Sequence, residues 1–215
     1  PTNCIWEAQV VHTPTWVSTF LAGEMGIMTR TWSLDRCTAQ AADLVFSFDA
    51  SPWGIGGVLV HKGCIVSWFM DVVTDADLKH LRLKMDSTAR QALEALAVLV
   101  GMRLRKAWRA QRRCTAALRG DNMTALTMAL TLRAPKGPVK RIARELALVD
   151  CEAAFEPRFA EHVAGVGNIL ADLLSRRHDP ALQHGWKLPA LLCEVSRAIA
   201  PVRVAASWRL PAIYA

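Results

Sequence analysis

The chain has 215 residues, and its composition, 52% hydrophobic and 21% charged, is that of a globular protein rather than a disordered or fibrous one. The net charge of +7 favours polyanionic partners, nucleic acid first, although a merely soluble basic protein fits it equally well. No apolar run approaches the roughly 18 residues of a membrane span, so we expect no membrane contact. Six cysteines without CxxC or zinc-type spacing predict reduced thiols in an intracellular protein, in the cytoplasm or the nucleus.

Three regions are expected along the chain. Residues 1–42 form an N-terminal segment of mixed composition, with one helix expected around 15–25. Residues 43–179 carry the sharp patterns of a folded domain. Residues 180–215 contain four prolines and no clear period, so they are interpreted as a tail, a linker or the start of a further region. The chain opens on Pro1 with no signal-peptide pattern, which suggests a piece of a longer polypeptide.

The predicted elements of the central region alternate between β-type runs and helical periods. The β-type runs are 43–50, 54–60, 64–70, 114–122 and 151–160. The helical segments are 86–113, 123–134, 138–150 and 168–177. Residues 61–63 form a tight turn, and 71–85 are expected to be a polar connection.

This order predicts an α/β fold with a mixed five-stranded sheet flanked by helices. The first three strands follow one another closely and form an antiparallel meander. The fourth and fifth reach the sheet through helical crossovers, which make parallel pairings. Pro157 removes a backbone donor from the fifth strand and favours an edge position for it.

Four acidic residues stand out by their positions in these elements. Asp49 and Asp121 end the first and fourth strands, Glu94 is the only charge in the apolar window 92–102, and Asp172 lies in the last helix. A carboxylate in apolar surroundings is costly unless it is paired or bound to a cation. Ligand sites of α/β sheets gather near strand ends, and converging carboxylates there would repel one another. A pair of hard divalent cations is the simplest compensation.

Each acid taken alone also has a plain structural interpretation. Asp49 can form a turn, Asp121 can cap the following helix, and Asp172 can be an ordinary surface residue. Glu94 can face solvent at the edge of its apolar stripe, or pair with Arg90 one turn earlier. These alternatives are reasonable singly and less so for all four together.

The stretches DASPWGIGGVL, EALAVL, RGDNMTAL and HVAGVGNILADLLSR resemble the ribonuclease H domain of reverse-transcribing elements, over about residues 43–178. The last stretch is similar to the end of this domain in long-terminal-repeat and tyrosine-recombinase retroelements. Residues 16–33 resemble the connection that follows the reverse transcriptase in such polyproteins. In strand-transfer relatives of the same fold the catalytic Glu comes after the second Asp, whereas Glu94 precedes Asp121, which favours ribonuclease H.

The resemblance implies roles for individual residues. Asp49, Glu94, Asp121 and Asp172 match the four metal-binding carboxylates, which implies two Mg²⁺ ions, replaceable by Mn²⁺. In that scheme Asp49 bridges both ions, Glu94 and Asp121 share one, and Asp172 completes the other. His162 matches a mobile loop His that aids product release or relays protons, although an ordinary loop His is an alternative.

Three polar residues near the carboxylates are predicted to bind the substrate. Asn168 matches a loop-end Asn, and Ser51 and Asn122 are candidates for reading the RNA strand near its 2′-OH. Ala164 departs from the family pattern, which often has Pro there; the difference concerns the stiffness of the loop.

Two basic runs, 103–113 and 133–144, carry six and five Lys or Arg residues without an acid. Related enzymes can carry a basic hybrid-binding protrusion at the second run, which makes Lys136, Lys140 and Arg141 candidate substrate contacts. A solvated helix surface explains both runs equally well.

The sequence therefore predicts an endoribonuclease that hydrolyses the RNA strand of RNA/DNA hybrids, joined to a reverse transcriptase in one polyprotein. The alternative is a catalytically inactive or repurposed ribonuclease H-like module that binds nucleic acid or tethers parts of the polyprotein. An intact set of four carboxylates favours the enzyme, because a tether needs none of them. The oligomeric state is left open.

Overall fold

The computed structural model describes residues 17, 18, 22, 44–83, 87–104, 114–134, 137–152, 155–182, 184–199, 203 and 208. The predicted N-terminal segment 1–42 lies almost wholly outside the described residues, and so does most of the basic run 103–113. No helix in the described ranges is both long and apolar enough to cross a membrane.

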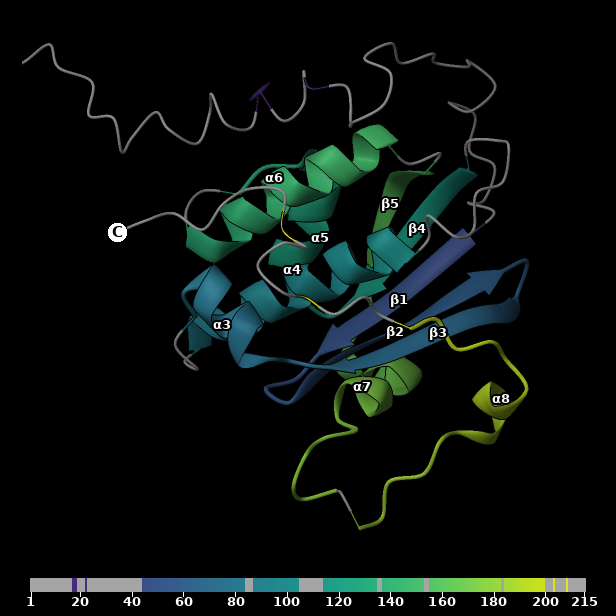
Figure 1. Ribbon diagram of the computed structural model, residues 1–215. Coiled ribbons are helices and arrows are strands. Elements are labelled where there is room, and N and C mark those ends of the chain that lie inside the picture. Colours follow the sequence, from purple (N-terminus) through teal and green to yellow (C-terminus); the bar gives the residue numbers. More distant parts are fainter. Residues whose placement is uncertain are drawn as a thin grey trace, which may run out of the picture.

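Five strands form one mixed sheet in the order β3-β2-β1-β4-β5 (Figure 1). They are β1 Leu44–Ala50, β2 Gly54–His61, β3 Cys64–Val72, β4 Cys114–Gly120 and β5 Phe155–His162. β1 pairs antiparallel with β2, and β2 with β3, whereas β4 lies parallel to β1 and β5 parallel to β4. This confirms the predicted sheet, and the arrangement is that of the ribonuclease H-like fold.

Local chemistry explains the ends of this sheet. Lys62 and Gly63 join β2 to β3 with φ angles of 50° and 81°, the left-handed pair that a two-residue hairpin turn requires. β5 is an edge strand, as Pro157 predicts. Its pairing with β4 shifts by one residue between Ala116 and Ala117, directly beside Pro157. The bulge absorbs the missing proline donor.

Helices cover both faces of the sheet (Figure 1). One face carries α4 Ser87–Leu104, α5 Met123–Thr131 and α6 Gly137–Glu152, and the opposite face carries α7 Ile169–Ser175. The core lies between the sheet and the first group of helices, and its largest fully buried side chains include Phe46, Phe48, Leu93, Leu96 and Leu99. The site residues of β1 and α4 therefore stand on the most deeply packed elements.

The expectation of a polar connection over 71–85 was wrong in one part, because α3 Asp75–Leu81 forms there. Thr74 and Asp77 build a capping box: the Asp77 N–H donates to Thr74 Oγ1 at 3.2 Å, and the Thr74 N–H donates to Asp77 Oδ2 at 3.0 Å. Arg82, in the left-handed conformation, ends the helix. The caps stabilise a helix that a search for apolar periodicity overlooks.

Part of the described chain beyond 180 packs against the edge of the sheet next to β3. The Trp68 N–H donates to the Ser196 carbonyl at 3.3 Å, and the Ala198 N–H donates to the Trp68 carbonyl at 2.8 Å. The short helix α8 Ala190–Cys193 places Leu192 in a small cluster with Trp68. A second attachment is Arg203, buried beside α3. The division at 179 stays a prediction.

Candidate metal centre

Three of the four predicted carboxylates converge at the end of the central strand. Asp49 comes from β1, Glu94 from α4, and Asp121 from the residue after β4. One carboxylate oxygen of each lies within 4.8 Å of the other two. Because β1 and β4 are parallel neighbours, their carboxyl ends meet at one edge of the sheet. α4 crosses that face and adds its single acid.

Glu94 is fully buried, and neither of its carboxylate oxygens has a hydrogen-bond partner of normal geometry among the described residues. Burial, together with the nearby charges of Asp49 and Asp121, raises the pKa of Glu94 from 4.5 to about 9. The Ala50 backbone and Arg90 lower this pKa only in part. Because Glu94 is buried and Arg90 forms its ion pair with Asp121, both alternatives for Glu94, exposure to solvent and pairing with Arg90, are wrong.

Asp49 is also buried, and it is held from the opposite face of the sheet. The hydroxyl of Ser175, the last residue of α7, donates to Asp49 Oδ2 at 2.5 Å. Burial, reinforced by the charges of Asp172 and Asp121 and opposed by the Ser175 hydrogen bond, raises the pKa of Asp49 from 3.8 to about 6. Sequence reasoning missed Ser175, although it stands within the stretch that carries the family resemblance.

The glycine-rich strand β2 lets α7 approach closely enough to make this contact. A Cβ atom on Gly56 would lie 2.6 Å from Leu174 Cβ and 2.7 Å from the Ser175 nitrogen. Such distances are too short for any side chain, so α7 can lie at its present depth only over glycine. The glycines that follow Asp49 in sequence thus determine where Ser175 and Asp172 stand.

Asp121 combines a paired and an unpaired oxygen. Its Oδ2 accepts from Arg90 Nη2 at 3.1 Å, whereas its buried Oδ1 has no partner among the described residues. The helix-cap alternative for Asp121 was one residue off: Asn122 is the N-cap of α5, and its Oδ1 accepts from the Ala125 N–H at 3.1 Å. Asp121 is thereby left for the cluster.

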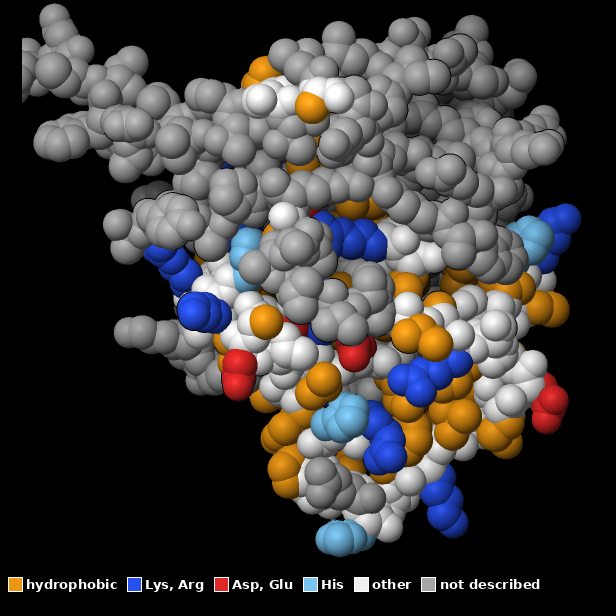
Figure 2. All heavy atoms as spheres, in the orientation of Figure 1, with side chains coloured by type: hydrophobic (Ala, Val, Ile, Leu, Met, Phe, Trp, Pro, Cys, Tyr) orange, Lys and Arg blue, Asp and Glu red, His pale blue; other side chains and the backbone are white. Residues whose placement is uncertain are grey.

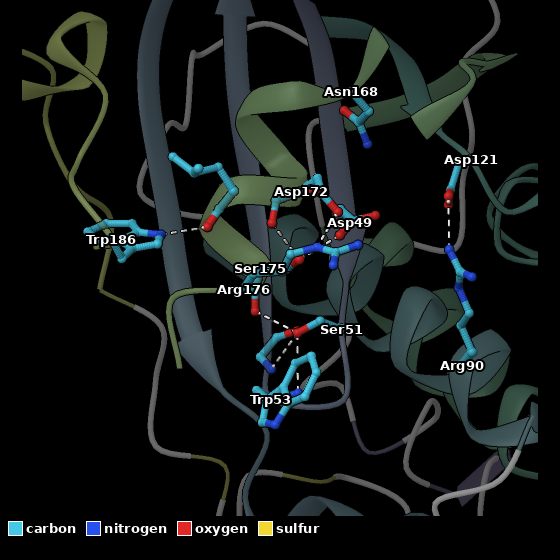
Figure 3. Close-up of polar contacts among 12 residues, drawn as sticks. Asp49, Ser51, Trp53, Arg90, Asp121, Asn168, Asp172, Ser175, Arg176 and Trp186 are labelled. Atoms are coloured by element: carbon cyan, nitrogen blue, oxygen red, sulfur yellow. Dashed lines mark hydrogen bonds and ion pairs between the residues drawn. The ribbon is translucent and has the colours of Figure 1, made fainter. Parts of the chain in front are cut away.

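Asp172 lies beside the cluster and is not one of its three converging members. Its Oδ1 forms an ion pair with Arg176 Nε at 2.7 Å, one turn along α7 (Figure 3). Asp49, Asp172, Arg90 and Arg176 all line a cavity of about 320 Å³. The fourth predicted ligand therefore faces the same hollow as the first.

Two other predicted residues, Ser51 and Asn168, hold the site together. Ser51 Oγ donates to the Ser175 carbonyl at 2.7 Å and accepts from the Gly54 N–H at 3.1 Å. Asn168, buried before α7, donates through Nδ2 to the Phe48 carbonyl at 2.7 Å. Both side chains fix α7 to β1. A role in reading substrate remains a prediction for Ser51, Asn122 and Asn168.

His162 ends β5 and is exposed, with Nε2 3.1 Å from the Asp121 carbonyl oxygen. The following Val163 N–H donates to the Gly120 carbonyl at 3.0 Å, and the short turn η3 Gly165–Gly167 then leads towards α7. The predicted loop His therefore lies at the rim of the site, within reach of solvent.

The predicted basic contacts differ in accessibility. Lys140 is exposed on α6, whereas Arg141 is buried and donates to the His80 carbonyl. Lys136 lies outside the described residues. On the face shown in Figure 2, Lys and Arg side chains of the described residues are dispersed among apolar ones rather than gathered in one patch.

The donor set fits hard divalent cations. Glu94 Oε1, Glu94 Oε2 and Asp121 Oδ1 are buried oxygens without partners in the described part of the chain, a costly arrangement for a protein to keep. Carboxylate oxygens are the ligands that Mg²⁺ and Mn²⁺ prefer. A cation at this cluster would satisfy these atoms and remove their mutual repulsion.

No protein-family model and no curated protein matches the chain. Among solved structures it is similar to the crystal structure of RNase H1 from the halophilic archaeon Halobacterium salinarum NRC-1, at 20% sequence identity and a TM-score of 0.47. The match covers 62% of this chain and 95% of that one. The strand order and the pairings of the sheet define a ribonuclease H-like fold, with a buried acidic cluster that could hold a metal ion.

Proposed function

We propose that this chain is a ribonuclease H that hydrolyses the RNA strand of RNA/DNA hybrids with the help of two Mg²⁺ ions. The observation that carries the proposal is the convergence of Asp49, Glu94 and Asp121, with three buried carboxylate oxygens that lack partners among the described residues. A module that only tethers or binds nucleic acid has no use for such a cluster, which costs folding free energy when it stands without cations.

The roles proposed for the carboxylates are those that the family resemblance implies. Asp49 would hold both cations, Glu94 and Asp121 one of them, and Asp172 the other; Mn²⁺ can replace Mg²⁺. Cations bound here would supply an activated water and stabilise the leaving 3′ oxygen. The remaining task of the chain is positioning. Ser175 fixes the orientation of the Asp49 carboxylate from the far face of the sheet.

His162 is proposed to move protons at the rim of the site. Its ring is exposed and anchored to the backbone of Asp121 at 3.1 Å, so it can exchange protons with solvent beside the reacting phosphate. Lys140, exposed on α6, and Lys136 are proposed to contact the phosphates of the hybrid. Arg141 is left out of this set, because it is buried against the His80 carbonyl.

We further propose that the domain works within a retroelement polyprotein, joined to a reverse transcriptase, in the cytoplasm or the nucleus. The stretch 162–176, HVAGVGNILADLLSR, supports this context. It supplies His162, Asn168, Asp172 and Ser175 together, so the most family-like stretch of the chain is also the one that completes the site.

The test is a substrate panel with the purified chain, in Mg²⁺ and in EDTA. We expect Mg²⁺-dependent cleavage of the RNA strand in an RNA/DNA hybrid, and no cleavage of duplex DNA of the same sequence. Folded protein that binds the hybrid without cutting it would favour a repurposed binding module. Cleavage or joining of duplex DNA would favour a strand-transfer enzyme.

A further inference from the structure

Two arginines form ion pairs with carboxylates of the site, each with one oxygen of Asp121 or of Asp172. Arg90 Nη2 lies 3.1 Å from Asp121 Oδ2, and Arg176 Nε lies 2.7 Å from Asp172 Oδ1. They approach from different elements, Arg90 from α4 and Arg176 from the end of α7 (Figure 3). Both line the cavity of about 320 Å³ beside Asp49. The two guanidinium groups thus stand where the cations and a substrate strand would meet.

The arginines also act on the buried carboxylates beyond their own partners. The positive charge of Arg176 lowers the pKa of Asp49, and that of Arg90 lowers the pKa of Glu94, in each case less than burial raises it. With Glu94 protonated at neutral pH, three carboxylates against two guanidinium groups still leave an excess of negative charge. The arginines therefore balance part of the charge that divalent cations would balance fully.

Both ion pairs are partly exposed to solvent. The side chains of Arg90 and Asp121 are 64% and 19% exposed, and those of Arg176 and Asp172 are 45% and 38% exposed. By contrast, Arg203 and its partner Asp77 are 1% and 0% exposed. Solvent-exposed ion pairs contribute little stability, so a cation can displace the arginines at low cost.

We propose that Arg90 and Arg176 are exchangeable counterions, which neutralise Asp121 and Asp172 until divalent cations bind and then turn to the phosphates of the nucleic-acid strand. A guanidinium group suits this exchange, because its planar fork matches carboxylate and phosphate oxygens alike. The phosphate step rests on the proposed function; the competition with cations does not.

The first test measures Mg²⁺ binding to the full chain by calorimetry, without nucleic acid. Arg90→Gln and Arg176→Gln should each bind Mg²⁺ about fivefold more tightly than the wild type, because the cation no longer has to displace an exposed ion pair. Arg177→Gln is the matched control, since Arg177 stacks on the Trp186 ring at 4.6 Å and does not line the cavity. Unchanged or weaker Mg²⁺ binding in the first two variants would overturn the proposal, as would an equal gain in the control.

The second test measures binding of an RNA/DNA hybrid in Ca²⁺ over a range of salt. Each Gln variant should bind the hybrid more weakly and lose about one unit of salt slope, while Arg177→Gln should not. Wild-type affinity and slope in both variants would overturn the phosphate step. Failure of the proposed function looks different: the wild type would leave the hybrid uncut in Mg²⁺, while the calorimetric gain of the variants persisted.

Discussion

Ser175 and Asp49 meet across the sheet, with the serine hydroxyl donating to the carboxylate at 2.5 Å. The donor ends a helix on one face, and the acceptor is the next-to-last residue of the central strand, 126 residues away in sequence. The carboxylate at the centre of the site is therefore oriented by an element that lies on the opposite face from Glu94. The hydrogen bond also counteracts part of the rise in pKa that burial causes in Asp49.

We expect Ser175→Ala to reduce cleavage by about tenfold or more, as loss of a partner that orients a metal ligand commonly does. The pKa of Asp49 should rise above about 6, because the hydrogen bond that lowers it is gone. The acidic limb of the pH–rate profile should therefore move to higher pH. Ser47→Ala, in the same strand, is the control. An unshifted profile in Ser175→Ala would contradict this role.

Stability of the cation-free protein should fall as pH rises. Burial raises the pKa of Glu94 from 4.5 to about 9, so the folded chain holds a proton that the unfolded chain releases. The contribution of Glu94 to the free energy of unfolding is therefore fully present below pH 4.5. It is lost progressively as the pH rises to about 9. Asp49 adds the same trend between 3.8 and about 6.

Denaturant unfolding in EDTA across this pH range measures the effect. Glu94→Gln should flatten the dependence and make the cation-free protein more stable than the wild type at alkaline pH, because the amide needs no proton. Asp75→Asn, an exposed substitution on α3, should keep the wild-type slope. A Glu94→Gln variant as steep as the wild type would show that Glu94 does not titrate in this window.

Mg²⁺ should counteract the loss of stability at high pH, because the cation replaces the proton on Glu94. A ligand at a hundred times its Kd stabilises a folded protein by about 2.7 kcal/mol. The rise in melting temperature on adding Mg²⁺ should therefore grow with pH, and should be largely absent in Glu94→Gln. Thermal unfolding with and without Mg²⁺ provides the measurement; equal rises in the variant and the wild type would place the cation elsewhere.

The sheet and the convergence of three carboxylates could be predicted from the sequence, because both depend on local patterns. Asp49 and Asp121 end apolar strands, and Glu94 interrupts an apolar helix. Pairing partners were not predictable in the same way. Helix spacing allows Arg90 to pair with Glu94 one turn away, yet Arg90 pairs with Asp121, 31 residues along the chain. Helix spacing shows which residues share a face, and only the packing of α4 on the sheet, over β1 and β2, decides which acid the arginine meets.

The last region of the chain shows the same limit. Residues after 180 have no clear period, so the sequence predicted a tail, a linker or the start of a further region. Arg203 nevertheless makes two hydrogen bonds to Asp77, at 2.8 and 2.9 Å, and one to the Val72 carbonyl at 2.6 Å. Its partners lie more than 120 residues earlier, where no local pattern can indicate them.

Arg203→Ala should therefore destabilise the fold by roughly 3–5 kcal/mol, the usual cost of leaving one partner of a buried ion pair alone. Arg197→Ala is the control: Arg197 is exposed and donates to the Met70 carbonyl at 3.3 Å, so its loss should cost less than about 1 kcal/mol. Denaturant midpoints compare the two. Equal and small losses would mean that the Arg203 attachment contributes nothing to stability.

Gly56→Ala tests whether the close approach of α7 positions the site. The added methyl would lie 2.6 Å from Leu174 Cβ, so α7 must move outward at a cost of about 1–3 kcal/mol. Cleavage should fall while the protein stays folded, because Ser175 and Asp172 move with the helix. Gly185→Ala, where nothing lies within 4 Å, should leave both stability and cleavage unchanged. Full activity in Gly56→Ala would show that the depth of α7 is not critical.

The most direct measurement is cleavage of a labelled RNA strand in an RNA/DNA hybrid, in Mg²⁺, by the wild type and by Asp49→Asn. Asp49 stands at the centre of the carboxylates, so its amide should abolish cleavage while Asp75→Asn leaves it intact. Mg²⁺-dependent cleavage by the wild type that is lost in Asp49→Asn is the predicted result. Cleavage that survives in a folded Asp49→Asn protein, or folded wild type that binds the hybrid and never cuts it, would contradict a metal-dependent ribonuclease built on this cluster.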